Sequence, residues 1–453
     1  MSQDLPKLIA APDIIPPATE AMQHPEFWIN RIGGNPDRKI MTPEQIRTFN
    51  SKNRTRSSGH KDVHGNTVTV DSEVTRGNFM GITYHIEDPL LLHTYPVEKL
   101  RERLQRIIDH IRNGNFWDRR RIPYPEGKKQ ELIAAIDIGS LSGEVTPRYG
   151  ITVRNTLNRV APTADRVFGS QYQWLDMFQN SVFETGTPVA VLHASKDGEW
   201  LCVKSDISIG WVPASNVALG DADFIRDLAD PDDFVVAITH KVPIYADKEC
   251  TIWLTDLYMG AKLGLKDKVA AAYRVNVPFR GHDGAVMAVN GWIKAGAEVS
   301  AGYQPYTQRN VITTFFRLLN RPYGWGGMDH ERACTGTIRA VFRTFGIFMP
   351  PWTTFQLAYT DHVITFPKDT SKEEKYRYLD TCEPGITVCG FDWHVTLYLG
   401  KVDGFHYVIH QNGYSYHDEN GNEVRVGRVS VNTTELEGGA DIGQWTDLAV
   451  FKP

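Results

Sequence analysis

The chain has 453 residues, which corresponds to roughly two to four domains of ordinary size. It carries 49 basic and 54 acidic residues, and the resulting net charge of −5 argues against a general nucleic-acid-binding protein, which normally has a strongly basic surface. With 41% hydrophobic and 11% aromatic residues the chain can form packed cores, and no run approaches the roughly 20 apolar residues of a membrane span.

The cysteines predict no disulfide framework. There are five of them, an odd number that leaves at least one free thiol, and no Cys-x-x-Cys pair suggests a zinc ribbon or a redox motif. The first residues, Met1–Pro6, have neither the basic nor the apolar region of a secretory leader. We therefore expect either a cytoplasmic protein or, if an export leader was removed, a protein of the cell envelope or periplasm.

Residues 1–140 predict a helical N-terminal cap. After Pro96, apolar residues recur at helical spacing, and a second short helix is expected around Leu132 and Ile136. The first of these helices is expected from Leu100, Leu104, Ile107, Ile108 and Ile111. A polar segment from Asn50 to Thr69 predicts a loop.

Two small β-barrels are expected next, over residues 141–225 and 226–304. In the first, alternating apolar residues around Val189 and Trp211 flank a turn at Lys196-Asp197-Gly198, a pattern typical of hairpins. The second region is again rich in glycine, with strands predicted at 242–245 and 273–278. The pattern of the first region resembles bacterial SH3-like barrels, and the second is interpreted as a more diverged one.

The region 305–453 contains the most informative local feature. A helix is predicted after Thr307, a residue that favours the N-cap position. A second amphipathic helix follows Ala333, with Cys334 in its first turn and Gly346 as its stop. A cysteine attacks as the thiolate, which the unpaired N–H groups and partial positive charge of a helix N-terminus stabilise.

A histidine pair supplies the base that such a thiol requires. The strands 394–400 and 405–410 predict a hairpin, and a turn centred near Val402 would place His394 directly opposite His410. In this arrangement Cys334 is the nucleophile, His394 is the general base and acid, and His410 holds the imidazole in its useful tautomer.

These motifs resemble the NlpC-type, papain-like cysteine peptidases that act on bacterial cell-wall peptides. The resemblance is found in Pro322-Tyr323-Gly324-Trp325-Gly326-Gly327, in Cys334-Thr335-Gly336, in the strand His394–Gly400, in Val408-Ile409-His410 and in Gly427–Val431. The order of a helical cap, two SH3-like domains and a peptidase domain is similar to that of the multidomain γ-D-glutamyl-L-diamino acid endopeptidases. The expected fold is therefore α+β and multidomain, with the catalytic domain at 305–453.

The resemblance also implies a function. Cys334, His394 and His410 fall on the family's catalytic positions, and Tyr323 falls on a tyrosine that helps to bind the oxyanion. The family needs no metal or cofactor and cuts the amide bond between γ-D-glutamate and a diamino acid in peptidoglycan stem peptides. We expect muropeptide partners, no nucleic acid, no membrane span and a monomer.

Substrate-binding positions depart from the family pattern. Relatives generally have Asp before the nucleophile, where it pairs with the terminal ammonium of the substrate, whereas this chain has Ala333. Thr335 replaces a common Ser, and Thr353 lies in an altered segment after the helix. We expect altered specificity, with Trp325 as a candidate wall of the cleft. The candidate replacement carboxylates are Glu184, Asp329 and Glu331.

Three other interpretations remain open from the sequence. A peptidoglycan-binding protein with impaired catalysis is suggested by Ala333 and the two barrels. A zinc site could be formed by Cys382, Cys389, His394 and His410, although the spacing lacks the short ligand pairs of structural zinc. The same triad could also transfer the acyl group to an amine rather than to water.

Overall fold

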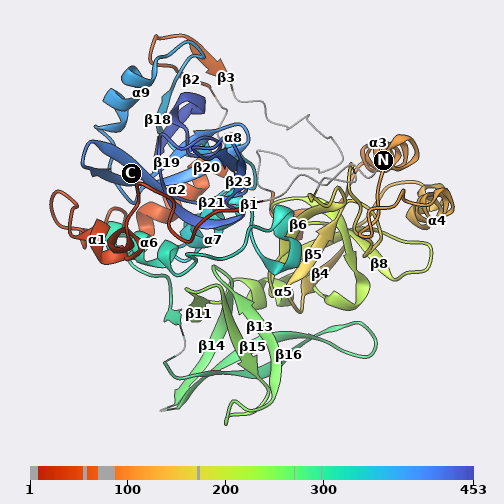
Figure 1. The fold of residues 1–453 in the computed structure, drawn as a ribbon. Helices are drawn as coiled ribbons and strands as arrows, with labels where there is room; N and C mark the ends of the chain where they lie inside the picture. Colours follow the sequence, from red (N-terminus) through yellow and green to blue (C-terminus); the bar gives the residue numbers. More distant parts are fainter. Residues whose placement is uncertain (1–8, 55–58, 70–86, 171–173, 270, 297) are drawn as a thin grey trace.

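The computed structural model describes residues 9–54, 59–69, 87–170, 174–269, 271–296 and 298–453, and it has three lobes (Figure 1). Two lobes each contain a seven-stranded sheet, and the third contains a six-stranded sheet with helices packed around it. The expected α+β, multidomain fold is confirmed. Within the described residues no helix combines the length and apolarity needed to cross a bilayer.

The N-terminal region contributes to two lobes. Its early part contains β1 (Ile9–Ala10), η1 (Glu20–Gln23), α1 (Pro25–Ile29), α2 (Pro43–Arg54), β2 (Gly59–Lys61) and β3 (Thr67–Thr69). Its later part contains η2 (Pro89–Leu91), α3 (Val97–Asn113), α4 (Glu126–Ile136) and η3 (Ile138–Ser140). The end of α2 and the β2–β3 hairpin occupy the described part of the segment expected to be a loop.

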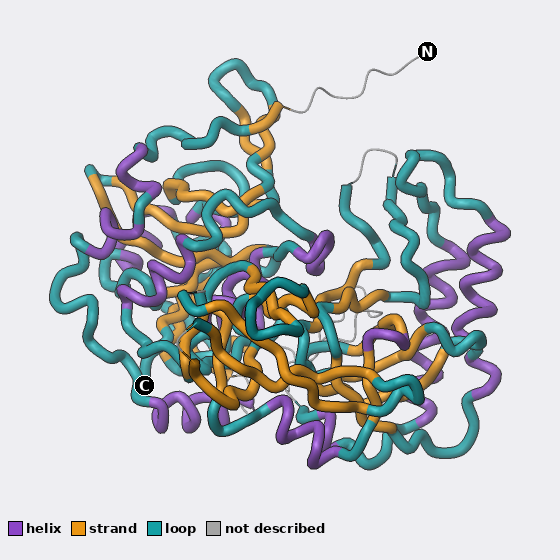
Figure 2. Tube along the Cα trace, turned by 90° about the horizontal axis from the view of Figure 1, so that it is seen from below, coloured by secondary structure: helices purple, strands orange, loops and turns teal. Residues whose placement is uncertain are grey.

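The two groups of helices bury their apolar faces in different cores. Trp28 and Phe49 of the early group join the core of the six-stranded lobe, whereas Leu104 and Ile136 of the later group join the core of the first barrel. Figure 2, seen from below, shows this second helix pair at the outer edge of the molecule. The expected single cap at 1–140 therefore makes two separate contributions, and the boundary at 140 stays a prediction.

The first seven-stranded sheet has the order β10-β4-β7-β8-β9-β5-β6. Its strands are β4 (Arg148–Thr152), β5 (Thr156–Arg159), β6 (Gln179–Phe183), β7 (Pro188–Ala194), β8 (Trp200–Lys204), β9 (Ile209–Pro213) and β10 (Val217–Leu219), with η4 (Ala214–Asn216) before the last. The predicted hairpin is present, because β7 and β8 pair antiparallel around the turn at Asp197-Gly198. Trp211 is fully buried between this sheet and α3.

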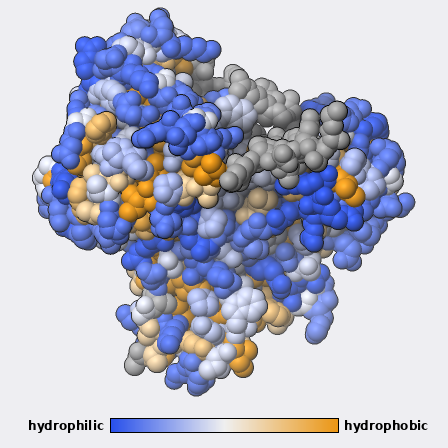
Figure 3. All heavy atoms as spheres, viewed as in Figure 1, coloured by the Kyte–Doolittle hydropathy of each residue, from blue (hydrophilic) through white to orange (hydrophobic). Residues whose placement is uncertain are grey.

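The second sheet has the order β13-β12-β16-β15-β14-β11-β17 and follows the short helix α5 (Ala222–Ala229). Its strands are β11 (Phe234–Ala237), β12 (Lys241–Tyr245), β13 (Trp253–Tyr258), β14 (Lys262–Val269), β15 (Ala272–Arg280), β16 (Val286–Lys294) and β17 (Val299–Ala301). Figure 3 shows apolar surface on this lower lobe, where Trp253 is 61% exposed and Met287 is 50% exposed.

The C-terminal lobe is built on a sheet of order β18-β25-β19-β20-β21-β24. Its strands are β18 (His362–Thr365), β19 (Thr387–Phe391), β20 (His394–Val402), β21 (Phe405–Asn412), β24 (Arg428–Thr433) and β25 (Asp447–Val450). Its helices are α6 (Gln308–Phe316), η5 (Trp325–His330), α7 (Cys334–Arg343), α8 (Thr353–Leu357), α9 (Lys372–Leu379) and η6 (Ile442–Gln444). A small separate sheet joins β1 to β23 (Glu423–Arg425) and β22 (Ser415–His417).

Local chemistry accounts for the two helices that place the site. Thr307 caps α6, since its Oγ1 accepts a hydrogen bond from the Asn310 N–H at 3.1 Å. In α7 the apolar stripe of Ile338, Val341 and Phe342 is buried against the sheet, and the chain turns after it at Gly346, where φ is +79°. Packing of α7 against β20 and β21 brings its N-terminus to the sheet.

Candidate functional site

Cys334 opens α7 and faces the start of β20. Ala333 occupies the N-cap with extended backbone and gives no side-chain cap, so the first N–H groups of the helix are left for other acceptors. The Cys334 side chain is almost completely buried, and its Sγ lies 4.0 Å from the carbonyl oxygen of Trp393. The thiol therefore lies beside the residue that directly precedes His394.

A hydrogen-bonded chain of side chains runs inward from His394. The Nε2 atom of His394 lies 2.6 Å from the Nδ1 atom of His410, and the Nε2 atom of His410 lies 2.8 Å from the Oδ1 atom of Asn432. All three side chains are buried. Ser430 also donates its hydroxyl to Asn432 Oδ1, at 2.7 Å.

The hydrogen bonds between His394, His410 and Asn432 determine which ring nitrogens carry protons. An amide oxygen only accepts hydrogen bonds, so His410 donates its Nε2–H to Asn432. The Nδ1 atom of neutral His410 is then an acceptor, and His394 donates its Nε2–H to it. The remaining nitrogen of neutral His394, Nδ1, is left unprotonated, which is the state that a general base requires.

The predicted cross-strand register was wrong by one pair, although the two histidines do meet. Leu397 pairs with Ile409 and Tyr398 with Val408, so His410 lies opposite Thr396 rather than opposite His394. The two histidines are therefore diagonal neighbours on one face. The hairpin turns at Asp403-Gly404, and this shift of the turn alone would place the two histidines on opposite faces of the sheet. A bulge between Tyr398 and Gly400 shifts the register once more and returns both histidines to the same face.

Burial keeps the thiol and the imidazoles neutral in the resting protein. Burial raises the pKa of Cys334 to about 11, although the backbone N–H groups of Val395, Thr335 and Cys334 favour the thiolate. Burial also lowers the pKa of His394 well below its usual value, helped by His410, and lowers the pKa of His410 to about 4. The pair is therefore a thiol and a neutral imidazole rather than a preformed ion pair.

Two tyrosines border the thiol. Burial, followed by the proximity of Cys334, raises the pKa of both Tyr323 and Tyr414, so each hydroxyl remains a hydrogen-bond donor. The Tyr414 ring stands edge-on to His394, with centroids 5.2 Å apart. Tyr323 lies close against the backbone of Gly413, where an added Cβ would come within 2.7 Å of its ring. The Tyr414 hydroxyl donates to the Trp393 carbonyl at 3.5 Å, the same oxygen that the thiol contacts.

The three candidate carboxylates are all engaged by arginines. Glu184 is buried and pairs with Arg343 at 2.9 Å and with Arg339 at 3.3 Å. Asp329 pairs with Arg166, and Glu331 pairs with Arg321. Binding of a substrate ammonium by any of them would require breaking an existing ion pair, so we do not assign them that role.

Other expected substrate-binding residues lie in the segments around the thiol. Trp325 is half-buried at the start of η5, and the following Gly326 and Gly327 have positive φ values and pack on β6 of the first barrel. Thr335 follows the nucleophile, and its carbonyl accepts a hydrogen bond from Gln356 Nε2 at 3.0 Å. Thr353 donates its hydroxyl to the carbonyl of Asp392, and so fixes the loop just before His394. The first barrel therefore borders the segment that leads into Cys334.

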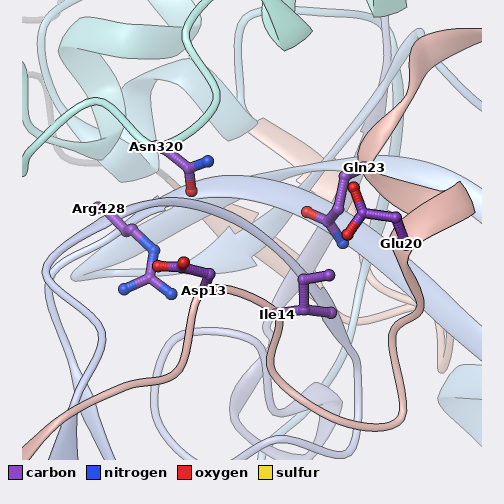
Figure 4. A pocket seen from close by; sticks show the side chains of 6 residues that line it. All are labelled: Asp13, Ile14, Glu20, Gln23, Asn320 and Arg428. Atoms are coloured by element: carbon purple, nitrogen blue, oxygen red, sulfur yellow. The ribbon is translucent and has the colours of Figure 1, made fainter.

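A metal cluster and a surface cavity were considered as other candidate sites. Across the described ranges no three His, Cys, Asp or Glu side chains are grouped as metal ligands, so Cys382 and Cys389 do not join the adjacent His394 and His410 in one cluster. A cavity of about 450 Å³ lies beside the N-terminal segment and contains none of the triad (Figure 4). It is lined by Asp13, Ile14, Glu20, Gln23, Asn320 and Arg428.

Sequence reasoning missed Asn432, Tyr414 and Gly439. Asn432 lies one residue beyond the strand segment noted at 427–431, and alternation from Ser430 could have placed it on the face of His410. Tyr414 follows β21 outside any regular strand. Gly439 packs on the His394 ring from a loop whose position no local pattern indicates.

Comparisons with known proteins address the fold and the first barrel. A family model described as an SH3 domain of the SH3b1 type matches residues 169–213. No curated protein matches the sequence. A solved NlpC/P60 endopeptidase from Photobacterium damselae subsp. piscicida is 18% identical, with coverage of 98% of each chain and a TM-score of 0.72. An NlpC/P60 family protein from Bacillus cereus ATCC 10987 is 16% identical over 67% of this chain and 100% of the other, with a TM-score of 0.46.

The resemblance found in the sequence is confirmed for the fold. At 18% identity the likeness to the Photobacterium enzyme shows a shared architecture that extends over nearly the whole chain. The SH3b1 match lies within the first barrel region predicted at 141–225. The chain thus has the multidomain α+β fold of an NlpC/P60 endopeptidase, with an SH3 domain of the SH3b1 type.

Proposed function

We propose that the protein is a cysteine endopeptidase that hydrolyses peptidoglycan peptides. The observation that supports this most strongly is the hydrogen-bonded series from His394 through His410 to Asn432, which leaves His394 Nδ1 without a proton, while the buried thiol of Cys334 contacts the carbonyl of the preceding residue, Trp393. Three polar side chains are buried here to orient one imidazole and to fix its tautomer. Peptide binding alone does not require a fixed tautomer, whereas general base catalysis does.

The proposed reaction begins with proton transfer from the Cys334 thiol to Nδ1 of His394. The sulfur attacks the scissile carbonyl carbon, and the oxyanion is met by the backbone N–H of Cys334 and the hydroxyl of Tyr323. His394 then gives its proton to the leaving amine as the C–N bond breaks. Water, deprotonated by His394, hydrolyses the thioester and restores the thiol.

The bond that we propose is the amide between γ-D-glutamate and the diamino acid of a stem peptide. The fold shared with an NlpC/P60 endopeptidase and the SH3 domain of the SH3b1 type support this substrate class. Ala333 leaves no carboxylate next to the nucleophile, and the neighbouring acids are paired with arginines. We therefore propose a specificity that does not depend on a free amino terminus, so that longer or amino-blocked stem peptides are cleaved.

Replacing Cys334 tests the covalent mechanism. Cys334→Ala is expected to lower kcat on purified muropeptides by at least about 10³-fold, and His394→Ala by a similar factor, because members of a triad act as a unit. Mass spectrometry of the products gives the rate and identifies the bond that is cut. Cys382→Ala is the matched control, since that half-buried thiol lies outside the site.

Retained turnover in Cys334→Ala, with a folded protein and wild-type kinetics, would contradict the proposal. Cleavage at a bond other than the γ-D-glutamyl amide would leave the cysteine peptidase in place and overturn the proposed bond.

A further inference from the structure

The position of Arg425 is fixed by the small sheet that carries it. Arg425 lies in β23, which is paired on one side with β1 and on the other with β22, so its backbone is fixed by a three-stranded sheet. Its neighbour Val424 is buried in a small apolar cluster with Ala11 and Ile15. Because side chains alternate along a strand, Arg425 projects from the opposite face of this sheet.

The Arg425 guanidinium rests on an aromatic pair that leads to the nucleophile. Its Cζ atom lies 3.7 Å from the ring centroid of Trp174, which comes from the first barrel lobe. The Trp174 ring stands edge-on to Tyr323, with centroids 5.4 Å apart. Burial raises the pKa of Tyr323, the proximity of Cys334 raises it further and Arg425 lowers it, so both groups lie close enough to act on this tyrosine.

The guanidinium of Arg425 forms no ion pair with a carboxylate in the described part of the chain. The Arg425 guanidinium lies over the Trp174 ring, and the side chain is half-buried. Burial lowers the pKa of Arg425, and Glu423 on the same strand face counteracts this without forming an ion pair with it. By contrast, Arg321 and Arg343 each have a carboxylate partner. A half-buried guanidinium that is held in place by stacking and lacks a carboxylate is suited to bind an anion.

We propose that Arg425 is a specificity residue that binds a carboxylate of the substrate peptide next to the scissile bond. This inference rests on the proposed function and extends it to the chemistry of the substrate. Two carboxylates of the stem peptide are candidates: the α-carboxylate of the γ-linked D-glutamate and a carboxylate of the diamino acid. Arginine suits either, because its planar fork matches a carboxylate with two parallel hydrogen bonds.

The test compares Arg425→Gln with the wild-type protein on three matched peptides. One peptide carries both carboxylates free, the second has the D-glutamate α-carboxyl amidated, and the third has the diamino acid carboxyl amidated. On the free peptide Arg425→Gln is expected to lose about 10- to 100-fold in kcat/KM, mainly through KM. On the peptide that lacks the recognised carboxylate, wild type and variant are expected to be equally poor.

Two further variants separate charge from geometry. Arg425→Lys keeps the charge but loses the planar fork and is expected to retain only part of the preference for the free carboxylate. Arg120→Gln, at an exposed arginine between α3 and α4, is the control and is expected to leave all three rates unchanged.

An equal loss on all three peptides would overturn the proposal, because it would show that Arg425 only supports the fold. Binding of the intact peptides to the inactive Cys334→Ala protein, measured by calorimetry with and without Arg425→Gln, keeps the inference testable if no bond is cut. If Arg425→Gln does not weaken binding of the free-carboxylate peptide in that assay, the inference fails whatever the fate of the peptidase proposal.

Discussion

At the scale of single residues, the position of the His394 ring depends on a glycine. A Cβ atom built on Gly439 would lie 2.5 Å from Cδ2 of His394 and 2.7 Å from its Nε2, closer than real Cβ contacts allow. The ring cannot move freely, because its Nε2 is hydrogen-bonded to His410. The absence of a side chain at residue 439 thus sets where the imidazole stands.

Gly439→Ala is expected to lower kcat by about 10- to 100-fold, since a shift of the base by a fraction of an ångström misaligns proton transfer. Steady-state kinetics on a muropeptide provide the measurement, with the folded fraction checked by the thermal midpoint. Gly443→Ala is the control, because its added Cβ would meet the side-chain ends of Lys372 and Asp441 and neither catalytic histidine. Wild-type kcat in Gly439→Ala would show that catalysis does not require the observed ring position.

The residues at the centre of the site could be predicted from short-range patterns. Cys334 was indicated by an amphipathic helix beginning at a cysteine, and both histidines by strand alternation. Glu184 was expected to face substrate, but the structure buries it against two arginines of α7 that are more than 150 residues away in the chain. A carboxylate has the same local sequence pattern whether its partner is a ligand or a distant arginine, so only the tertiary structure decides.

At the scale of elements, the β20–β21 hairpin shows why face and register differ in predictability. The face of each histidine follows from the period of two along a strand. The register depended on a tight turn at Asp403-Gly404 and on a bulge before Gly400, where φ is +125°. Each of these two departures from the assumed turn moves one histidine to the other face of the sheet. Together they leave His394 and His410 on the same face.

The ion pairs between Glu184 and α7 connect the first barrel to the helix that bears the nucleophile. Burial alone would raise the pKa of Glu184, but Arg339 and Arg343 outweigh it and lower that pKa to about 2. The stabilisation is therefore fully present above the ordinary value of 4.5 and is lost as pH falls through 2. Glu184→Gln is expected to reduce the free energy of unfolding by about 3 kcal/mol at pH 7, because it leaves the buried guanidinium of Arg339 and the partly buried one of Arg343 without their carboxylate.

Thermal unfolding of wild type and Glu184→Gln across the range from pH 7 to pH 2 checks this. The two midpoints are expected to converge as the pH drops below 4.5. Asp109→Asn removes an exposed pair with Arg112 and is the control, with an expected effect of less than about 1 kcal/mol. A difference between wild type and Glu184→Gln that is independent of pH would contradict the assigned ionisation.

At the scale of the whole molecule, the chain completes the core of its last lobe with its first residues. Trp28 and Phe49 pack with residues of the sheet that presents His394, and Trp28 lies 5.4 Å from Tyr407 of β21, ring centre to ring centre. Within residues 1–140 the sequence predicted helices only near 100–111 and 132–136, so it indicated neither α1 nor α2 nor this contact. Even a predicted apolar helix face would look the same whichever core it joins. The early helices thus belong physically to the lobe that bears the thiol.

Trp28→Ala tests this organisation. The Trp28 side chain is 1% exposed and its Nε1–H donates to the Met22 carbonyl at 2.9 Å, so its removal leaves a cavity and an unpaired carbonyl. The expected cost is about 3–5 kcal/mol, confined to the C-terminal lobe. Hydrogen exchange followed by mass spectrometry is expected to show lost protection within 305–453 and unchanged protection within the first barrel at 148–219.

Trp253→Ala, at a tryptophan that is 61% exposed, is the control and is expected to change neither. Lost protection in the first barrel, with the C-terminal lobe intact, would contradict the assignment of the early helices, because it would place their stabilising contacts in the wrong core.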